Sequence, residues 1–186
     1  MEIINKRKAN INGKNFEDKV SNENRIIEKG WIKQTIYPNN KSKSNFYYED
    51  KVNKICFFKQ RSLKLYFQNN FDIELHRSPD EAYLFENENK TYNLKILEQR
   101  NQNTEGSVEL KMMSGTEVKK EYELLLGSNF EVEYAFCISE FLENKYKSDK
   151  QIYKIRKQIL DENNIVLLYG DSENYFEKLD EWIGNN

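Results

Sequence analysis

The stretch EAYLFENENKTYNLKILEQR, residues 81–100, decides the fold of this 186-residue chain. It holds two runs rich in aliphatic and aromatic residues, 81–86 and 92–100, on either side of the polar sequence NENKT. Apolar runs of this length around a turn sequence are typical of a β-hairpin. We therefore expect a pair of antiparallel strands near the centre of the sequence.

Downstream of this hairpin, helical and strand patterns alternate. Two helical stretches are expected within 107–126, on either side of Ser114-Gly115. The remaining elements predicted in chain order are a strand over 131–138, helices over 140–147 and 149–162, a short buried strand over 165–169 and a closing helix over 174–183.

Upstream of the hairpin, the patterns are more polar. Residues 15–29 are expected to form one helix, because apolar residues recur near helical spacing and Gly30 follows as a stop. Residues 38–54 are rich in turn-forming types, which predicts a loop. Residues 55–69 mix apolar and basic side chains in a helical rhythm, which predicts a second helix.

The whole order of elements predicts an α/β fold with a mixed central β-sheet flanked by helices. The chain has only two prolines and seven glycines, with no repeat and no Gly/Ser-rich linker. We therefore expect residues 1–186 to form a single domain that begins with a basic segment, residues 1–14.

The formal net charge of −2 hides an uneven distribution of charge. Residues 1–70 hold 15 Lys and Arg against 7 Asp and Glu, whereas residues 71–186 hold 14 against 24. A basic half can meet the phosphates of a nucleic acid even when the whole chain is near neutral. The net charge therefore does not exclude DNA as a partner.

Several other classes of protein are excluded by counting residues. Two cysteines and one histidine cannot build a four-ligand zinc site or a disulfide framework. Both cysteines lie in apolar runs, which favours buried free thiols in a reducing compartment. No run of about 18 apolar residues and no secretory leader is present, so we expect a cytoplasmic protein without a membrane partner.

Charged side chains suited to a metal site flank the central hairpin. Asp80 follows Pro79 at the start of the first strand, and Glu98 and Arg100 are two residues apart on the second strand, so they share a face. Two carboxylates on neighbouring strands can converge on one divalent ion, and oxygen ligands with open positions suit Mg²⁺. The alternatives are a plain turn at Pro79-Asp80 and a solvated sheet face, although Ile96 makes that face half apolar.

These residues resemble the signature of the PD-(D/E)xK nucleases. Pro79-Asp80 and Glu98-Gln99-Arg100 stand at its positions, and Gln102 matches an E-x-K-x-Q extension of part of that superfamily. The strings ILEQRNQNTEGSVE, YAFCISEFL and IVLLYGDSENYFEKLDEWI are similar to small type II restriction endonucleases, a resemblance that covers roughly residues 15–184.

The resemblance implies a restriction-endonuclease-like fold and Mg²⁺-dependent cleavage of double-stranded DNA. It also implies a homodimer that acts at a short palindrome, because duplex DNA offers two equivalent strands. A cognate DNA methyltransferase would act on the same site without needing to bind this chain.

The sequence departs from the motif at Arg100, where the family has lysine. Arginine does not deprotonate at working pH, so Arg100 cannot act as a base, although it can stabilise charge on the phosphate. We expect either that Arg100 acts only electrostatically or that Lys111 supplies the missing ammonium from the following helix.

The expected metal ligands are Asp80, Glu98 and the backbone carbonyl of Gln99. Glu17 matches the place of an auxiliary acidic ligand, and a solvated helix position explains it equally well. Glu109 is a second candidate ligand, with a surface role as its alternative. We expect Gln102 to orient the end of the hairpin or a DNA phosphate.

DNA contacts are expected from basic residues of the first half, with 38–54 as a possible recognition segment and a solvated face as the alternative for each residue. The expected DNA-binding residues are Lys6, Arg7, Lys14, Lys41, Lys43, Lys59, Arg61, Lys64 and Arg77.

The sequence thus predicts a type II restriction endonuclease. One rival is a nickase or repair endonuclease of the same fold, and the other is a relative that lost activity through Arg100 and only binds DNA. No Gly-rich phosphate loop occurs, and the lone His76 cannot form a His-metal nuclease site.

Overall fold

The computed structural model describes residues 14–38, 42, 44–103 and 108–184 of the chain. These residues fall into two compact units. The strand unit comprises residues 22–98 and 117–134, and the terminal unit comprises the described residues of 1–21, 99–116 and 135–186.

The first five strands form an antiparallel meander in which each strand pairs with the next one in the chain. The central hairpin has the predicted bounds, with the short 3₁₀ helix η1 (Glu88–Lys90) in its turn. The five strands are β1 (Ile32–Thr35), β2 (Phe46–Asp50), β3 (Ile55–Lys59), β4 (Glu81–Glu86) and β5 (Tyr92–Arg100).

Strands β6 (Phe130–Ile138) and β7 (Ile165–Tyr169) complete a seven-stranded sheet of order β1-β2-β3-β4-β5-β6-β7. The start of β5 is bonded to the start of β6, where Tyr92 N–H donates to Asn129 O at 2.9 Å. The end of β5 is bonded to the end of β6, where Ser139 N–H donates to Arg100 O at 3.1 Å. This arrangement is that of parallel strands, so the sheet is mixed. The predicted α/β fold with a mixed sheet is confirmed.

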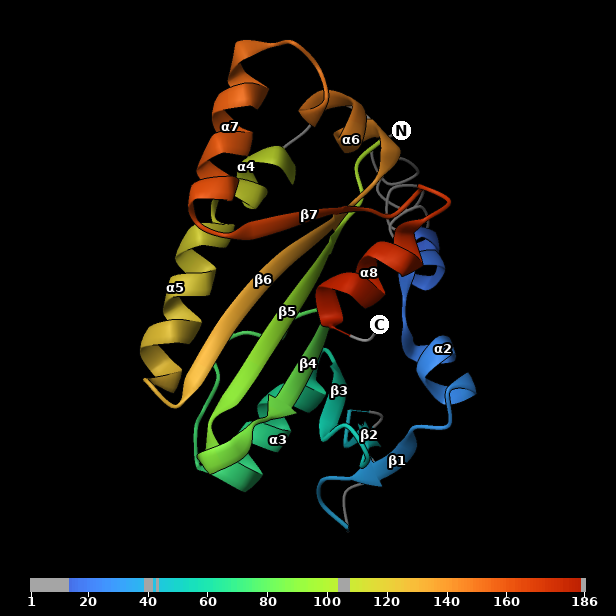
Figure 1. Ribbon diagram of the computed structural model, residues 1–186, viewed down its shortest axis with the longest axis vertical. Coiled ribbons are helices and arrows are strands. Elements are labelled where there is room, and N and C mark those ends of the chain that lie inside the picture. Colours follow the sequence, from blue (N-terminus) through green and yellow to red (C-terminus); the bar gives the residue numbers. More distant parts are fainter. Residues whose placement is uncertain (1–13, 39–41, 43, 104–107, 185–186) are drawn as a thin grey trace, which may run out of the picture. The chain divides into compact units, whose positions relative to one another are not determined.

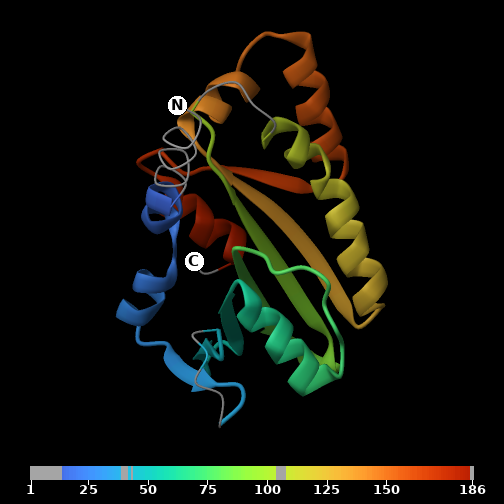
Figure 2. The same ribbon diagram turned by 180° about the vertical axis from the view of Figure 1, so that it is seen from behind.

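Helix α3 (Arg61–Phe71) covers one face of the sheet in the strand unit and packs there through aromatic rings (Figure 2). Tyr66 lies 4.8 Å from Phe58 of β3 between ring centroids, and Phe67 lies 5.5 Å from Phe130 of β6. Tilted aromatic pairs of this kind bury a large apolar area. The alternation of β3 to β5 therefore directs one set of side chains into this aromatic core.

The terminal unit is built around β7, which packs against α7 (Gln151–Glu162) and α8 (Tyr175–Ile183), as Figure 1 shows. Gly170, directly after β7, cannot carry a side chain, because a Cβ atom there would lie 2.7 Å from both Cys137 Sγ and Phe16 Cζ. The other helices of this unit are residues 14–20, α4 (Val108–Met113) and α6 (Glu140–Tyr146), and α5 (Gly115–Leu126) continues from it into the strand unit.

The single helix predicted over 15–29 is wrong, because the chain breaks at Asn22. Residues 14–20 are helical and α2 (Glu23–Glu28) begins anew. The backbone N–H of Asn22 donates to Glu81 Oε1 at 3.1 Å instead of to a carbonyl of the preceding turn. A contact distant in sequence therefore overrides the local helical periodicity.

The predicted loop over 38–54 and helix over 55–69 are also wrong in part. Residues 46–50 form β2, and residues 55–59 form β3 before α3 begins at Arg61. Lys59 N–H donates to Ser62 Oγ at 3.0 Å, and Ser62 Oγ donates to Lys59 O at 2.8 Å, which closes a tight turn between strand and helix. Pairing with neighbouring strands determines the secondary structure of both segments, and the local sequence pattern does not reveal this pairing.

The two thiols are free, as the sequence predicts. Cys137 is buried, and Cys56 is half-buried. Burial, with a contribution from the charge of Glu49, raises the pKa of Cys56 to about 12. Separately, every helix in the described part of the chain is too short or too polar to cross a bilayer.

Candidate active site

Asp80 and Glu98 occupy opposite positions at one end of the central hairpin. The register pairs Glu81 of β4 with Leu97 of β5, so the next position outward places Asp80 opposite Glu98. Residues that face each other across antiparallel strands lie about 4.5–5.5 Å apart at their Cα atoms and point to the same face. The two residues that the motif singles out therefore lie at the same end of the hairpin in the strand unit.

Gln60 extends this row of residues on the other side of Asp80. The register pairs Lys59 with Glu81, and the N–H of Gln60 donates to the carbonyl oxygen of Asp80 at 3.3 Å. Gln60 has a φ of 49° and a ψ of −125°, a backbone region that favours glycine. The backbone beside Asp80 is thus strained, a feature often found at functional sites.

Tyr122 of α5 lies near Glu98 on the same side of the strand unit. Its hydroxyl donates to the carbonyl oxygen of Arg77 at 3.3 Å, and Arg77 Nε lies 2.8 Å from Glu121 Oε2. Burial raises the pKa of Tyr122, and the charges of Glu98 and Glu121 raise it further, against the opposite effect of Arg77. Tyr122 therefore remains a neutral hydrogen-bond donor beside the Glu98 carboxylate.

The donor set of this row fits Mg²⁺. Carboxylate oxygens are the hard ligands that Mg²⁺ prefers, and Mg²⁺ often takes only one or two of them beside waters and a substrate phosphate. Within the described ranges, no group of three or more His, Cys, Asp and Glu side chains is arranged to hold a metal ion. A pair of carboxylates with open positions suits an ion that is shared with a phosphate.

Arg100 follows Glu98 by two positions on β5, and the two side chains alternate with the buried Gln99. Arg100 Nη1 donates to the carbonyl oxygen of Gln99 at 3.0 Å, and the Arg100 guanidinium carbon lies 5.7 Å from the centroid of the Phe136 ring. The Gln99 carbonyl, expected as a metal ligand, therefore already accepts one hydrogen bond. A carbonyl oxygen has a second lone pair, which can accept a metal ion beside this hydrogen bond.

Gln102 is tied to the end of β6 through its backbone. Its N–H donates to Ser139 Oγ at 3.1 Å, and Ser139 Oγ donates to its carbonyl oxygen at 2.9 Å. Both residues are buried. These bonds fix the backbone at Gln102 and do not involve its side chain.

Glu109 is the centre of a buried ion-pair cluster in the terminal unit. The ammonium of Lys145 donates to Oε1, while Arg156 Nη1 lies 2.7 Å and Tyr153 OH 2.9 Å from Oε2. Burial alone would raise the pKa of Glu109, but the hydrogen bonds from Lys145, Tyr153 and Arg156 outweigh it and lower the pKa.

The surface role considered for Glu109 is wrong, because its side chain is only 8% exposed. Two cations already neutralise its carboxylate, which disfavours the auxiliary metal-ligand role. Lys111, two residues further along α4, is exposed, as are Glu17 and Lys14 on the helix of residues 14–20. The sequence does not reveal this cluster, since the partners of Glu109 lie 36 to 47 positions away from it, on α6 and α7.

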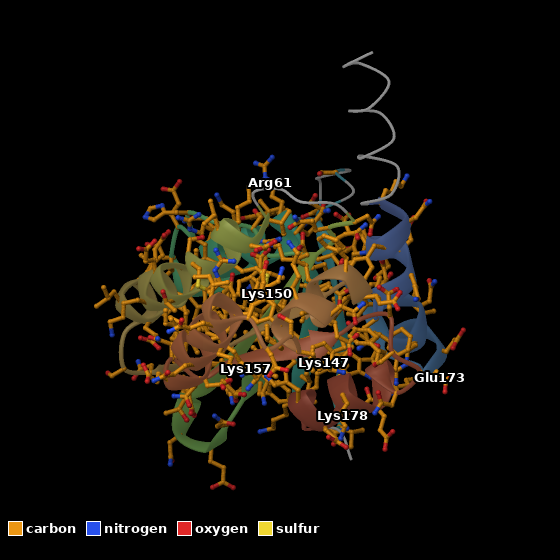
Figure 3. The ribbon with its side chains drawn as sticks, turned by 90° about the horizontal axis from the view of Figure 1, so that it is seen from above. Arg61, Lys147, Lys150, Lys157, Glu173 and Lys178 are labelled. Atoms are coloured by element: carbon orange, nitrogen blue, oxygen red, sulfur yellow. The ribbon has the colours of Figure 1, made fainter. Side chains whose placement is uncertain are left out.

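The predicted DNA-binding residues of the strand unit differ in their availability. Lys59 is half-buried and lies 3.2 Å from Glu23 Oε2, and Lys64 Nζ lies 3.5 Å from the carbonyl oxygen of His76. Arg61 is exposed and extends away from the surrounding side chains (Figure 3). Arg61 therefore has the best access to a phosphate among these three cations.

Arg77 is exposed but forms the ion pair with Glu121 described above. This pair is mostly open to solvent, so it costs little to exchange for a phosphate. The remaining predicted cations lie outside the described residues: Lys6, Arg7, Lys41 and Lys43.

Comparisons of the chain with models of known protein families, with curated proteins and with solved structures gave no significant match. The case for a nuclease site therefore depends on the motif and on the geometry of the row of residues described above.

Proposed function

We propose that this protein is a type II restriction endonuclease, which hydrolyses phosphodiester bonds of double-stranded DNA with Mg²⁺. The observation that carries the proposal is the register of β4 and β5, which ends at the pair Glu81–Leu97, directly beside Asp80 and Glu98. Two carboxylates on neighbouring strands can bind one divalent cation together. The motif Pro79-Asp80 and Glu98-Gln99-Arg100 independently supports the same pair.

Asp80, Glu98 and the carbonyl of Gln99 would hold the ion in this proposal. When bound, Mg²⁺ acts as a Lewis acid and lowers the pKa of its water. Arg100 holds a permanent positive charge on the strand that carries Glu98, and this charge stabilises the negative charge that develops on the phosphate. Tyr122 is a neutral donor near Glu98, and its hydroxyl holds the backbone carbonyl of Arg77.

The DNA would be held by exposed cations outside this row of residues. Arg61 and Arg77 contact phosphates in the strand unit, and Lys111 offers an exposed ammonium on α4. Such contacts fix the position of the duplex without reading its sequence. Two copies of the chain would supply one site for each strand of the duplex.

The test is cleavage of supercoiled plasmid and of mixed genomic DNA with Mg²⁺ or Mn²⁺. We expect Asp80→Asn and Glu98→Gln each to lower the cleavage rate by at least about 100-fold, because each removes one charged ligand. Glu86→Gln is the matched control, since Glu86 lies on the same strand face as Asp80 but is exposed at the far end of β4.

Each outcome separates the proposal from its rivals. Linear products with defined ends support a restriction endonuclease, and nicked circles alone would indicate a nickase. Salt-sensitive DNA binding without any cleavage would indicate a binding protein that lost activity, and equal rates for the three variants would refute the site.

A further inference from the structure

Strand β7 lies at one edge of the sheet and carries no charged residue. Its sequence is IVLLY, whereas the strand at the other edge, β1, has the sequence IKQT with the exposed Lys33. Exposed edge strands offer their backbone groups to other chains, and proteins commonly protect them with charged residues, lysine above all. By this criterion β1 is protected within the strand and β7 is not.

The backbone of β7 shows which of its groups point away from the sheet. The N–H of Gly170 donates to the carbonyl oxygen of Ile138 at 2.9 Å, so this position faces β6. Successive residues of a strand direct their backbone groups to opposite sides, so every second residue of β7 before Gly170 also faces β6. Leu167 and Tyr169 therefore direct their N–H groups to the outer edge, where β7 has no neighbour among the described strands.

A groove of about 610 Å³ follows this outer edge in the terminal unit. Four consecutive residues of β7, 166–169, line it, and their side chains alternate between the two faces of the strand. Lys147 Nζ of α6 lies 4.7 Å from the centroid of the Tyr169 ring, so one set of side chains faces α6. The other set includes Val166, which is 39% exposed. Residues of both faces line one groove only along the edge of a strand, so the groove has the form of a site for an added strand.

The groove fits a strand that is apolar and uncharged. The four residues of β7 that line it are uncharged, as is Trp182 of α8. The charged residues at its rims form ion pairs within the chain, Glu143 with Lys147 on α6 and Lys178 with Glu181 on α8. Each pair is neutral, so neither rim attracts a charged segment. Val, Ile and Thr side chains pack best against such a pleated surface.

We propose that the groove along β7 binds an extended segment of a partner protein, uncharged and rich in Val, Ile and Thr, which pairs with β7 as an additional strand. Backbone hydrogen bonds to Leu167 and Tyr169 supply the affinity, and the apolar walls select the side chains. A folded second copy of this chain is not the partner, because its own β7 lies at the floor of an identical groove. A flexible segment has no such rims. The inference does not rest on the nuclease proposal, since no DNA takes part.

The first test uses the full chain and two forms of the acetylated and amidated peptide TVTVT, measured by calorimetric titration. One form is N-methylated at every second residue, so that one edge keeps its N–H groups, and the other is N-methylated at every residue. We expect the first form to bind with a Kd below about 1 mM and the second at least about tenfold more weakly, because only the first can donate to β7.

Both forms carry the same side chains, so the comparison isolates the backbone hydrogen bonds. Equal affinities would show that the groove binds apolar side chains without pairing and would overturn the proposal. The absence of binding by the first form at about 5 mM would overturn it as well.

Hydrogen exchange of single amides, followed by NMR, locates the bound peptide. With the first form at saturation, the amides of Leu167 and Tyr169 should exchange at least about tenfold more slowly, because both become hydrogen-bonded. The amide of Leu168 faces β6 and is the internal control, which should change by less than about twofold. Slow exchange of Leu167 and Tyr169 without any peptide would show that another segment or another copy already covers the edge, and the proposal would fail.

A last test places a charge in the groove. Val166→Lys should weaken binding of the first form at least about tenfold, whereas Val166→Thr, a β-branched control, should retain it within about threefold. Circular-dichroism melting curves verify that each variant folds, and the exchange measurement decides the matter if Val166→Lys does not. Unchanged binding by a folded Val166→Lys variant would place the peptide elsewhere and contradict the proposal.

Discussion

Arg100 replaces the lysine of the nuclease motif with a cation that cannot release its proton. In the proposed site its charge acts on the phosphate in the transition state. We expect Arg100→Ala to lower the cleavage rate at saturating DNA by about 10²–10³-fold and Arg100→Lys to stay within about tenfold of the wild type. Arg61→Ala, as a contrast, should weaken binding more than it slows the saturated rate. Wild-type cleavage by Arg100→Ala would eliminate the assigned role.

Gln60 keeps a backbone conformation that only glycine adopts without strain, at the end of β3 and beside Asp80. We expect Gln60→Gly to raise the free energy of unfolding by about 1 kcal/mol, measured by urea denaturation. The control is Gln68→Gly on the exposed face of α3, where the same change should lower it by about 1 kcal/mol. A loss of stability in both variants would show that the turn at Gln60 is not strained.

At the scale of elements, the Glu109 cluster joins α4 to α6 and α7 within the terminal unit. Removing the carboxylate leaves Lys145 and Arg156 buried without their anion. We expect Glu109→Gln to lower the free energy of unfolding by about 3 kcal/mol, whereas Glu140→Gln, which changes an exposed acid on α6, should have little effect.

The difference in the free energy of unfolding between the wild type and Glu109→Gln should decrease as the pH falls. The pKa of Glu109 is lowered in the folded protein from its ordinary value of 4.5. The stabilisation by its charge is therefore fully present above about pH 4.5 and is lost as the pH falls through the lowered pKa of the folded state. Urea denaturation at several pH values should show wild type and Glu109→Gln converging in stability on acidification. A constant difference would contradict the assignment.

For some of the helices and strands, the local sequence pattern is sufficient to predict the observed structure. The hairpin of β4 and β5 is predicted with its observed bounds, because both strands are rich in aliphatic and aromatic residues and a polar turn joins them. The upstream errors have one physical cause, since bonds between distant segments decide the structure there. Asn22 bonds to Glu81, and the strand ICFFK gains its partners from β2 and β4. No local periodicity contains that information.

In the molecule as a whole, the site residues likewise divide into those that local sequence predicts and those that depend on contacts between distant segments. The motif alone indicates Asp80 and Glu98, because the hairpin that carries them is local in sequence. The sequence does not indicate Tyr122, because Tyr122 belongs to α5, which is distant from the hairpin in the chain. It does not indicate Gln60 either, because the sequence KQRS does not predict the turn that strains the Gln60 backbone. The ion-pair cluster around Glu109 is also not predictable from local sequence, because the partners of Glu109 lie 36 to 47 positions away.

If Asp80 and Glu98 hold a cation together, binding it must stabilise the folded chain. We expect millimolar Mg²⁺, or Ca²⁺ where cleavage must be avoided, to raise the melting temperature of the metal-free wild type. At an ion concentration ten times the Kd the gain is about 1.4 kcal/mol, because the unfolded chain has no such pair. The gain should disappear in both Asp80→Asn and Glu98→Gln and persist in Glu86→Gln, measured by calorimetry without DNA. Equal shifts in all four proteins would indicate unspecific ion binding and would contradict a metal site at Asp80 and Glu98.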